Sequence, residues 1–292
     1  MSPTAVALIL VAAVAHASWN LFSKQASAAG VGSFIWLMSA AAAVLCAPVI
    51  AVSVLVEPPR LTGLCWIFLA GTGVLEAGYF LFLQNGYRLG DLSLVYPIGR
   101  GTGALLAALA GIAAFGERPG AVAIAGIVCL VAGIVMIGIP VRARNRPPRA
   151  ASAVSAAMFA LVTGVFIASY TLWDKYAVTA LRTPPLLQGY AAFPIIALLF
   201  APQAHRARDR TARVWQAYRP QVLGAAVLCP LAYILVLAAL SFTAVSAVAP
   251  AREVSVLFGV LLGRRLLNEG GLARRLMAAA AIVTGIVAIA IG

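Results

Sequence analysis

The fold is decided by two stretches of nine residues, HASWNLFSK at 16–24 and IASYTLWDK at 167–175. Ala, Ser, Leu and Lys match between them without a gap. Two further positions keep aromatic character, Trp19 with Tyr170 and Phe22 with Trp173. A match of this kind, 151 residues apart, indicates that the chain contains two copies of one structural unit.

The composition predicts that both copies lie in a membrane. Hydrophobic residues make up 63% of the 292 residues and charged residues only 10%, whereas a soluble domain has roughly a quarter charged residues. The apolar runs are long and continuous, which indicates helices of about 20 residues that cross ~30 Å of lipid, not the short alternating strands of a barrel. The net charge of +13 comes from short loops between these runs, so no nucleic-acid partner is expected.

Ten apolar segments, separated by turn-forming residues, predict an all-α integral membrane protein of ten transmembrane helices. The expected helices are 4–24, 31–55, 63–87, 92–115, 120–139, 152–174, 184–202, 220–243, 246–263 and 272–291. The expected domains are a first half at 1–141, a basic cytoplasmic linker at 142–150 and a second half at 151–292. Because five is odd, the second five-helix half enters from the opposite side, which gives an inverted repeat around a central cavity, with the substrate site near the midplane.

The basic residues predict the orientation. Fifteen of them fall in the loops after odd-numbered helices and four on the opposite side, and cytoplasmic loops are enriched in Lys and Arg. The fifteen are Lys24, Arg88, Arg142, Arg144, Arg146, Arg149, Arg206, Arg208, Arg210, Arg213, Arg219, Arg264, Arg265, Arg274 and Arg275. We therefore expect a multi-pass protein of a bacterial inner (plasma) membrane with both termini in the periplasm.

The two halves, together with the turn Gly116-Glu117-Arg118 and its counterpart Asn268-Glu269, resemble the EamA branch of the drug/metabolite transporter superfamily. The resemblance covers essentially the whole chain. That branch includes exporters of amino acids and related metabolites, such as the YddG-like proteins, and the superfamily also holds sugar-phosphate and nucleotide-sugar exchangers and small multidrug pumps. The resemblance implies a basket of helices around a central cavity. The small multidrug pumps rely on a Glu in their first helix, and this chain has no acid there.

Polar residues inside the membrane are candidate site residues, because a charged one costs at least ~2.5 kcal/mol at a helix centre. His16, Trp19 and Asn20 share one face of helix 1, since residues three and four apart lie on the same side. The repeat places Tyr170 and Trp173 in the matching part of helix 6. These two groups are expected either to line the cavity or to form hydrogen bonds between helices.

Glu76 is the deepest acid, ~18 Å into helix 3 at 1.5 Å per residue, and Tyr79 shares its face. Glu76 is a candidate proton carrier, a binder of a substrate amine or a partner of Arg100; a structural ion pair or a protonated, hydrogen-bonded acid is the alternative. Tyr96 and Tyr233 complete the expected lining.

Arg100 and Arg252 follow Pro97 and Pro250 in matching helices, aligned with a one-residue gap, and Glu253 adjoins the second arginine. A guanidinium does not lose its proton, so each arginine needs an anion or water. A substrate carboxylate or phosphate, or an internal acid such as Glu253, meets that need equally well.

These features predict a secondary transporter of small metabolites, with amino acids favoured, that works by alternating access. Exchange of anionic or phosphorylated metabolites and a non-transport membrane role are the alternatives. No enzyme is expected, because no nucleophile elbow or metal motif is present, and no nucleotide-binding loop indicates an ATP-driven pump. We expect no cofactor or metal, a small-molecule substrate and the lipid bilayer as partners, and a monomer. The four cysteines are read as packing residues.

Overall fold

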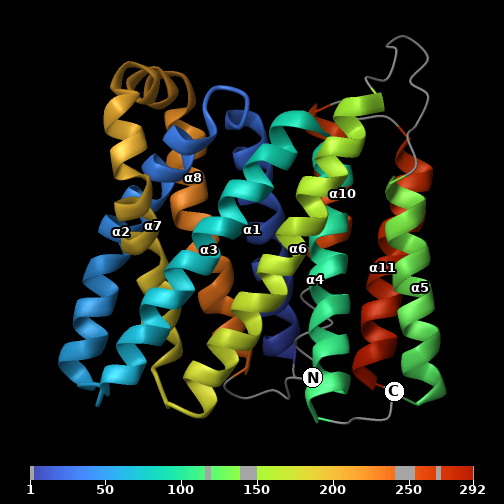
Figure 1. The fold of residues 1–292 in the computed structure, drawn as a ribbon, viewed down its shortest axis with the longest axis horizontal. Coiled ribbons are helices and arrows are strands. Elements are labelled where there is room, and N and C mark those ends of the chain that lie inside the picture. The colour runs from blue at the N-terminus through green and yellow to red at the C-terminus, as the bar shows by residue number, and fades with distance from the viewer. Residues whose placement is uncertain (1–2, 116–119, 139–149, 241–253, 268–270, 292) are drawn as a thin grey trace.

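A computed structural model describes residues 3–115, 120–138, 150–240, 254–267 and 271–291. Over these ranges the chain forms ten α-helices (Figure 1). They are α1 (Pro3–Ala26), α2 (Val31–Val56), α3 (Gly63–Leu89), α4 (Leu92–Phe115), α5 (Ala121–Gly138), α6 (Ala150–Thr179), α7 (Pro185–Arg206), α8 (Arg208–Leu240), α10 (Ser255–Leu267) and α11 (Leu272–Ile291).

The outer faces of these helices are apolar. Among the described residues, seven helices are long and apolar enough to cross a membrane: α1, α2, α3, α6, α7, α8 and α11. Large hydrophobic side chains lie exposed on them, for instance Leu55 at 80% and Trp66 at 61%. Such surfaces are unfavourable in water but match a lipid environment. The protein is therefore a multi-pass integral membrane protein, and the predicted all-α membrane class is confirmed.

Three helices differ from their predicted bounds. Helix α6 continues to Thr179, so Asp174 lies inside a helix and not at its end. Helix α8 begins at Arg208, and the prediction of a start at 220 is wrong, because the basic segment is itself helical up to a kink at Tyr218 (φ −128°, ψ 23°). Pro220 explains the kink, since proline has no N–H to donate and disfavours a helical residue before it. Of the predicted ninth helix, 246–263, residues up to 253 lie outside the described part.

The two halves are packed with two-fold symmetry. Helix α1 packs on α8, and its counterpart α6 packs on α3; likewise α2 contacts α8, and α7 contacts α3. The pairs α5–α11 and α2–α7 join helices that are counterparts of one another. In Figure 1, α1 starts at the end that holds both termini, whereas α6 starts at the opposite end. The predicted inverted repeat of two halves is therefore present in the fold.

The same contact occurs twice within this symmetry. A Cβ built on Gly71 of α3 would lie 2.4 Å from the ring of Trp173, and one on Gly224 of α8 would lie 2.5 Å from the ring of Phe22. Trp173 and Phe22 are the aromatic pair matched in the sequence repeat. Each ring thus occupies space that only a glycine leaves on the facing helix, which fixes how deeply the two helices approach.

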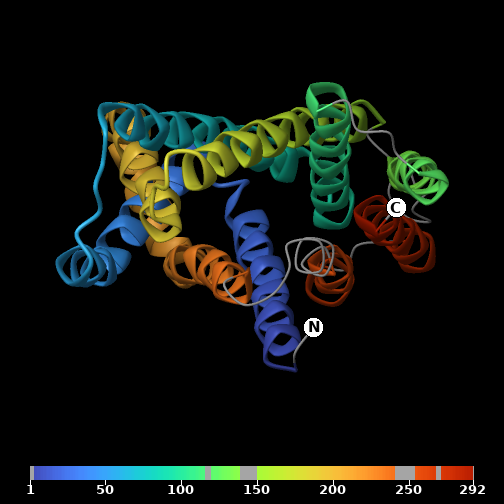
Figure 2. The ribbon, with the colours of Figure 1, turned by 90° about the horizontal axis from the view of Figure 1, so that it is seen from below.

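Helices α5 and α11 form a separate pair at one side of the molecule, away from α2, α7 and α8 (Figure 2). The core itself lies around α1, α3 and α4, where Trp19, Tyr87, Tyr96 and Phe80 are among the largest fully buried side chains. This core contains most of the residues that the sequence singles out.

Candidate functional site

The stripe on α1 is buried and internally bonded. Trp19 is 1% exposed, and its Nε1 donates to His16 Nδ1 at 3.3 Å, with the two ring centroids 5.4 Å apart. A nitrogen that accepts carries no proton in the neutral imidazole, so this contact assigns the ring proton of neutral His16 to Nε2. The His16 ring also lies 6.0 Å from the ring of Tyr96 on α4.

Asn20 connects α1 to α3. Its Nδ2 donates to the His16 carbonyl at 2.8 Å, and its Oδ1 accepts from the Tyr87 hydroxyl at 2.5 Å. One turn later, Lys24 Nζ donates to the carbonyls of Tyr87 and Gly90, where α3 ends. A cation at a helix C-terminus is favourable. These contacts are the interhelical hydrogen bonding that the sequence left open as an alternative for this stripe.

Aromatic rings run without a break from the first half to the second. Trp19 lies 5.8 Å from Phe80, Phe80 lies 5.0 Å from Tyr79, and Tyr79 lies 5.7 Å from Tyr170, all between ring centroids. Trp19 and Tyr170 are the matched residues of the repeat. The inverted packing therefore brings them to neighbouring rings of α3, and Phe80, which the sequence analysis did not select, joins them.

Two charged residues lie along this aromatic row. Glu76 precedes Tyr79 by one turn of α3 and interacts electrostatically with Asp174 on α6 and Cys229 on α8. Tyr79 interacts electrostatically with Arg100 of α4, which is 6% exposed. One acid and one arginine thus lie on either side of Tyr79, where α3, α4 and α6 meet.

Tyr96 holds α4 against α10. Its hydroxyl donates to Ser255 Oγ at 2.8 Å, with both residues buried. A Cβ built on Gly259 would lie 2.5 Å from its ring. Tyr96 therefore joins the first half to the second and also faces His16.

The remaining predicted residues lie elsewhere. Trp173 packs on Gly71, and its Nε1 donates to the Phe68 carbonyl at 2.9 Å. Tyr233 packs on Gly189 of α7. Arg252 and Glu253 are outside the described residues, so their predicted pairing with each other or with Arg100 stays a prediction.

The sequence analysis passed over Thr72 and Gln188, whose side chains join Asp174 in a buried hydrogen-bonded group. The signal for them is a lone polar side chain at 0% exposure in an otherwise apolar helix. It also passed over Cys229. The pattern Gly71-x-x-Val74-Leu75-Glu76 recurs as Gly224-x-x-Val227-Leu228-Cys229, and it sets Glu76 and Cys229 at equivalent positions.

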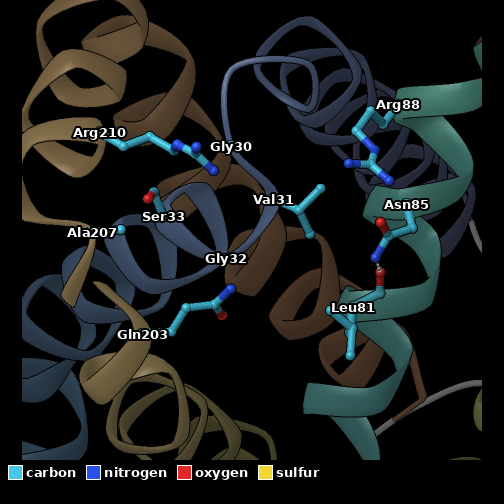
Figure 3. Close-up of a pocket in the computed structure, with 10 residues that line it drawn as sticks. All are labelled: Gly30, Val31, Gly32, Ser33, Leu81, Asn85, Arg88, Gln203, Ala207 and Arg210. Atoms are coloured by element: carbon cyan, nitrogen blue, oxygen red, sulfur yellow. Dashed lines mark hydrogen bonds between the residues drawn. The ribbon is translucent and has the colours of Figure 1, made fainter. Parts of the chain in front are cut away.

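A hollow of about 210 Å³ opens at the end of the molecule that carries the basic residues (Figure 3). Arg88 and Arg210 flank it from α3 and α8, with the first residues of α2 between them. Its lining comprises Gly30, Val31, Gly32, Ser33, Leu81, Asn85, Arg88, Gln203, Ala207 and Arg210. Two guanidinium groups beside a helix N-terminus give this opening a positive potential.

The fold and this interface define a multi-pass membrane protein made of two inverted repeats whose polar and aromatic residues converge on the seam between them. Residues 3–139, and again 154–291, match the family model described as "EamA-like transporter family". The chain therefore belongs to that family of transporters, and the family resemblance of the sequence is confirmed.

Two further comparisons add little about function. One solved structure, described only as "Crystal structure of protein", matches over 97% of this chain and 98% of its own, with a TM-score of 0.55 and 18% identity. At that identity the likeness concerns the fold alone. No curated protein matches this chain.

Proposed function

We propose that this transporter is a secondary carrier that moves an amino acid or a closely related metabolite across the membrane, with its substrate site around Tyr79. The observation that carries the proposal is the arrangement at the seam of the two halves. Aromatic rings from α1, α3 and α6 adjoin one another there, with Glu76 and Arg100 interacting along the same row.

An amino acid presents three groups that this arrangement suits. Arg100 offers a bidentate donor to a carboxylate, Glu76 offers an acceptor to an ammonium group, and the rings of Tyr79 and Tyr170 offer apolar area with a polar tip. Because Trp19 and Tyr170 come from different halves, rocking of one half against the other would change the site from both sides. Alternating access follows from such motion in inverted repeats.

The setting of the carrier belongs to the same proposal. The end with Arg88 and Arg210 faces the cytoplasm of a bacterial cell, both termini face the periplasm, and the carrier works as a monomer in the export direction. The uneven distribution of Lys and Arg supports this orientation.

Exchange of anionic metabolites is a second candidate. It is favoured by the buried Arg100 and by the hollow between Arg88 and Arg210, since guanidinium groups are suited to phosphate and carboxylate. This candidate predicts that uptake needs a counter-substrate inside the vesicle, whereas the amino-acid carrier does not.

The test is uptake by the purified protein in liposomes, with a panel of labelled amino acids, with and without a pH gradient. We expect Arg100→Gln to reduce uptake about tenfold or more, the effect of ~1.4 kcal/mol in binding. Gradient-dependent uptake that is lost in Glu76→Gln identifies Glu76 as a proton carrier, and gradient-independent uptake that survives in it identifies a facilitator. Glu57→Gln, an exposed acid at the end of α2, is the matched control.

Absence of uptake for every amino acid would contradict the proposal. Uptake of a phosphorylated compound that depends on internal counter-substrate would then support the second candidate.

A further inference from the structure

Three helices bring polar side chains together near the end of the molecule that holds both termini. Thr72 of α3 donates its hydroxyl proton to Asp174 Oδ1 of α6. Gln188 of α7 points its Nε2 at Asp174 Oδ1 at 3.1 Å and at Thr72 Oγ1 at 2.6 Å. Thr72 and Gln188 are both 0% exposed. A polar group placed so deeply in a membrane protein needs a specific partner.

The group contains more acceptors than donors. Gln188 Nε2 also faces the Phe68 carbonyl at 3.3 Å, so two amide protons face three oxygens. The Phe68 carbonyl already accepts from Trp173 Nε1 at 2.9 Å. Gln188 Oε1 is buried and has no hydrogen-bond partner among the described residues. Leaving such an oxygen unsatisfied costs about 1–3 kcal/mol.

The local charge is negative. Asp174 interacts electrostatically with a second acid, Glu76, one turn beyond Thr72 on α3. The side chain of Lys175, next in sequence, is outside the described residues. Surplus acceptors and two acids in a low-dielectric setting favour a bound cation.

We propose that Asp174, Thr72, Gln188 and the Phe68 carbonyl form a sodium-binding site. A half-turn of the Gln188 amide, whose oxygen and nitrogen are nearly isosteric, would direct Oε1 at the oxygens that Nε2 now faces. The ligands would then all be oxygen, which suits a hard cation. One direct carboxylate with three neutral oxygens balances a single positive charge, as sodium sites in transporters with inverted repeats require.

The site also lies where an ion would affect transport. It joins α6 and α7 of the second half to α3 of the first, and α3 and α6 carry Tyr79 and Tyr170. A cation held there would stabilise one arrangement of the halves. Its role as a coupling ion rests on the proposed function, whereas the binding itself does not.

Trp173 provides the readout, because its ring stacks on Phe68 at 4.1 Å between centroids. Purified full-length protein in micelles would be titrated with NaCl against choline chloride at constant ionic strength. Tryptophan fluorescence and the unfolding temperature would both be recorded. We expect a saturable response to Na⁺ in both signals. In Trp173→Phe the fluorescence change should disappear while the thermal shift remains.

Variants decide whether the response belongs to this site. We expect Asp174→Asn and Thr72→Val to weaken the apparent Na⁺ affinity at least tenfold, and Asp209→Asn, which removes an exposed acid on α8, to leave it unchanged. No response beyond that to choline, or a response unchanged in Asp174→Asn, would overturn the proposal. A response to pH alone would also overturn it. Intact Na⁺ binding in a protein that transports no amino acid would contradict the proposed function and leave this inference standing.

Discussion

At the residue scale, the seam is held by buried hydrogen bonds that each satisfy two helices at once. The bond from the Tyr87 hydroxyl to Asn20 Oδ1 is the clearest of them, at 2.5 Å with both residues at 0% exposure. In lipid such a bond between side chains contributes about 0.6 kcal/mol on average and up to ~1.7 kcal/mol. The position of α1 beside α3, and with it that of His16 and Trp19, depends on this contact.

Tyr87→Phe should therefore destabilise the protein by about 1 kcal/mol, because the buried amide oxygen of Asn20 loses its donor. Unfolding by SDS in mixed micelles measures the change. Tyr176→Phe is the control, since the Tyr176 ring is half exposed and stacks on Phe68 through its ring face. Equal effects of the two substitutions would mean that the hydroxyl–Asn20 bond contributes nothing specific.

At the element scale, glycines set the distance between helices. On α5 and α11 the approach is so close that a Cβ on Gly285 would lie 2.7 Å from the Gly126 carbonyl oxygen, and one on Gly133 would lie 2.8 Å from the Ala278 carbonyl oxygen. These neighbours are backbone atoms, which cannot rotate away as a side chain does. The α5–α11 pair is therefore a tightly closed contact between counterpart helices of the two halves.

Gly285→Ala should push the two helices apart and destabilise the protein by about 1–3 kcal/mol, the usual effect of overpacking. Thermal unfolding in micelles measures it, and Gly63→Ala serves as the control because a Cβ there would meet nothing within 4 Å. A destabilisation no larger than that of the control would show that α5 and α11 can separate without loss.

At the scale of the whole molecule, the two ends differ in charge. Arg88, Arg210, Arg264 and Arg265 lie at the end opposite to the termini, and the bend between α2 and α3 lies at the end with them (Figure 1). Basic residues are retained on the cytoplasmic side during insertion. The fold thus predicts one orientation for the entire chain.

Labelling of single cysteines tests that orientation. In a variant with Cys46, Cys65, Cys129 and Cys229 replaced, Glu57→Cys should react with a membrane-impermeant maleimide in intact cells. Asp209→Cys, at the basic end, should react only after lysis. Both positions are exposed, so accessibility within the protein is matched. The reverse pattern would place the termini in the cytoplasm.

The sequence by itself determined the class of this protein, because hydropathy is local and additive. Long apolar segments with few charges predict helices in lipid whatever their neighbours, and an odd number of helices per copy makes the repeat inverted. The failure at the start of α8 has the same origin, since a basic segment such as 208–217 reads as a loop although it is helical up to the kink at Tyr218.

Only the tertiary structure decided which side chains meet. Trp19 and Asn20 are neighbours on one predicted stripe, yet Trp19 contacts the Phe80 ring and Asn20 bonds to Tyr87. Asp174 was expected at a helix end and lies with Thr72 and Gln188, more than 100 residues and 14 residues away along the chain. Such meetings depend on how each helix is rotated and how closely glycines let it approach, and that is a property of pairs of helices which no single segment encodes.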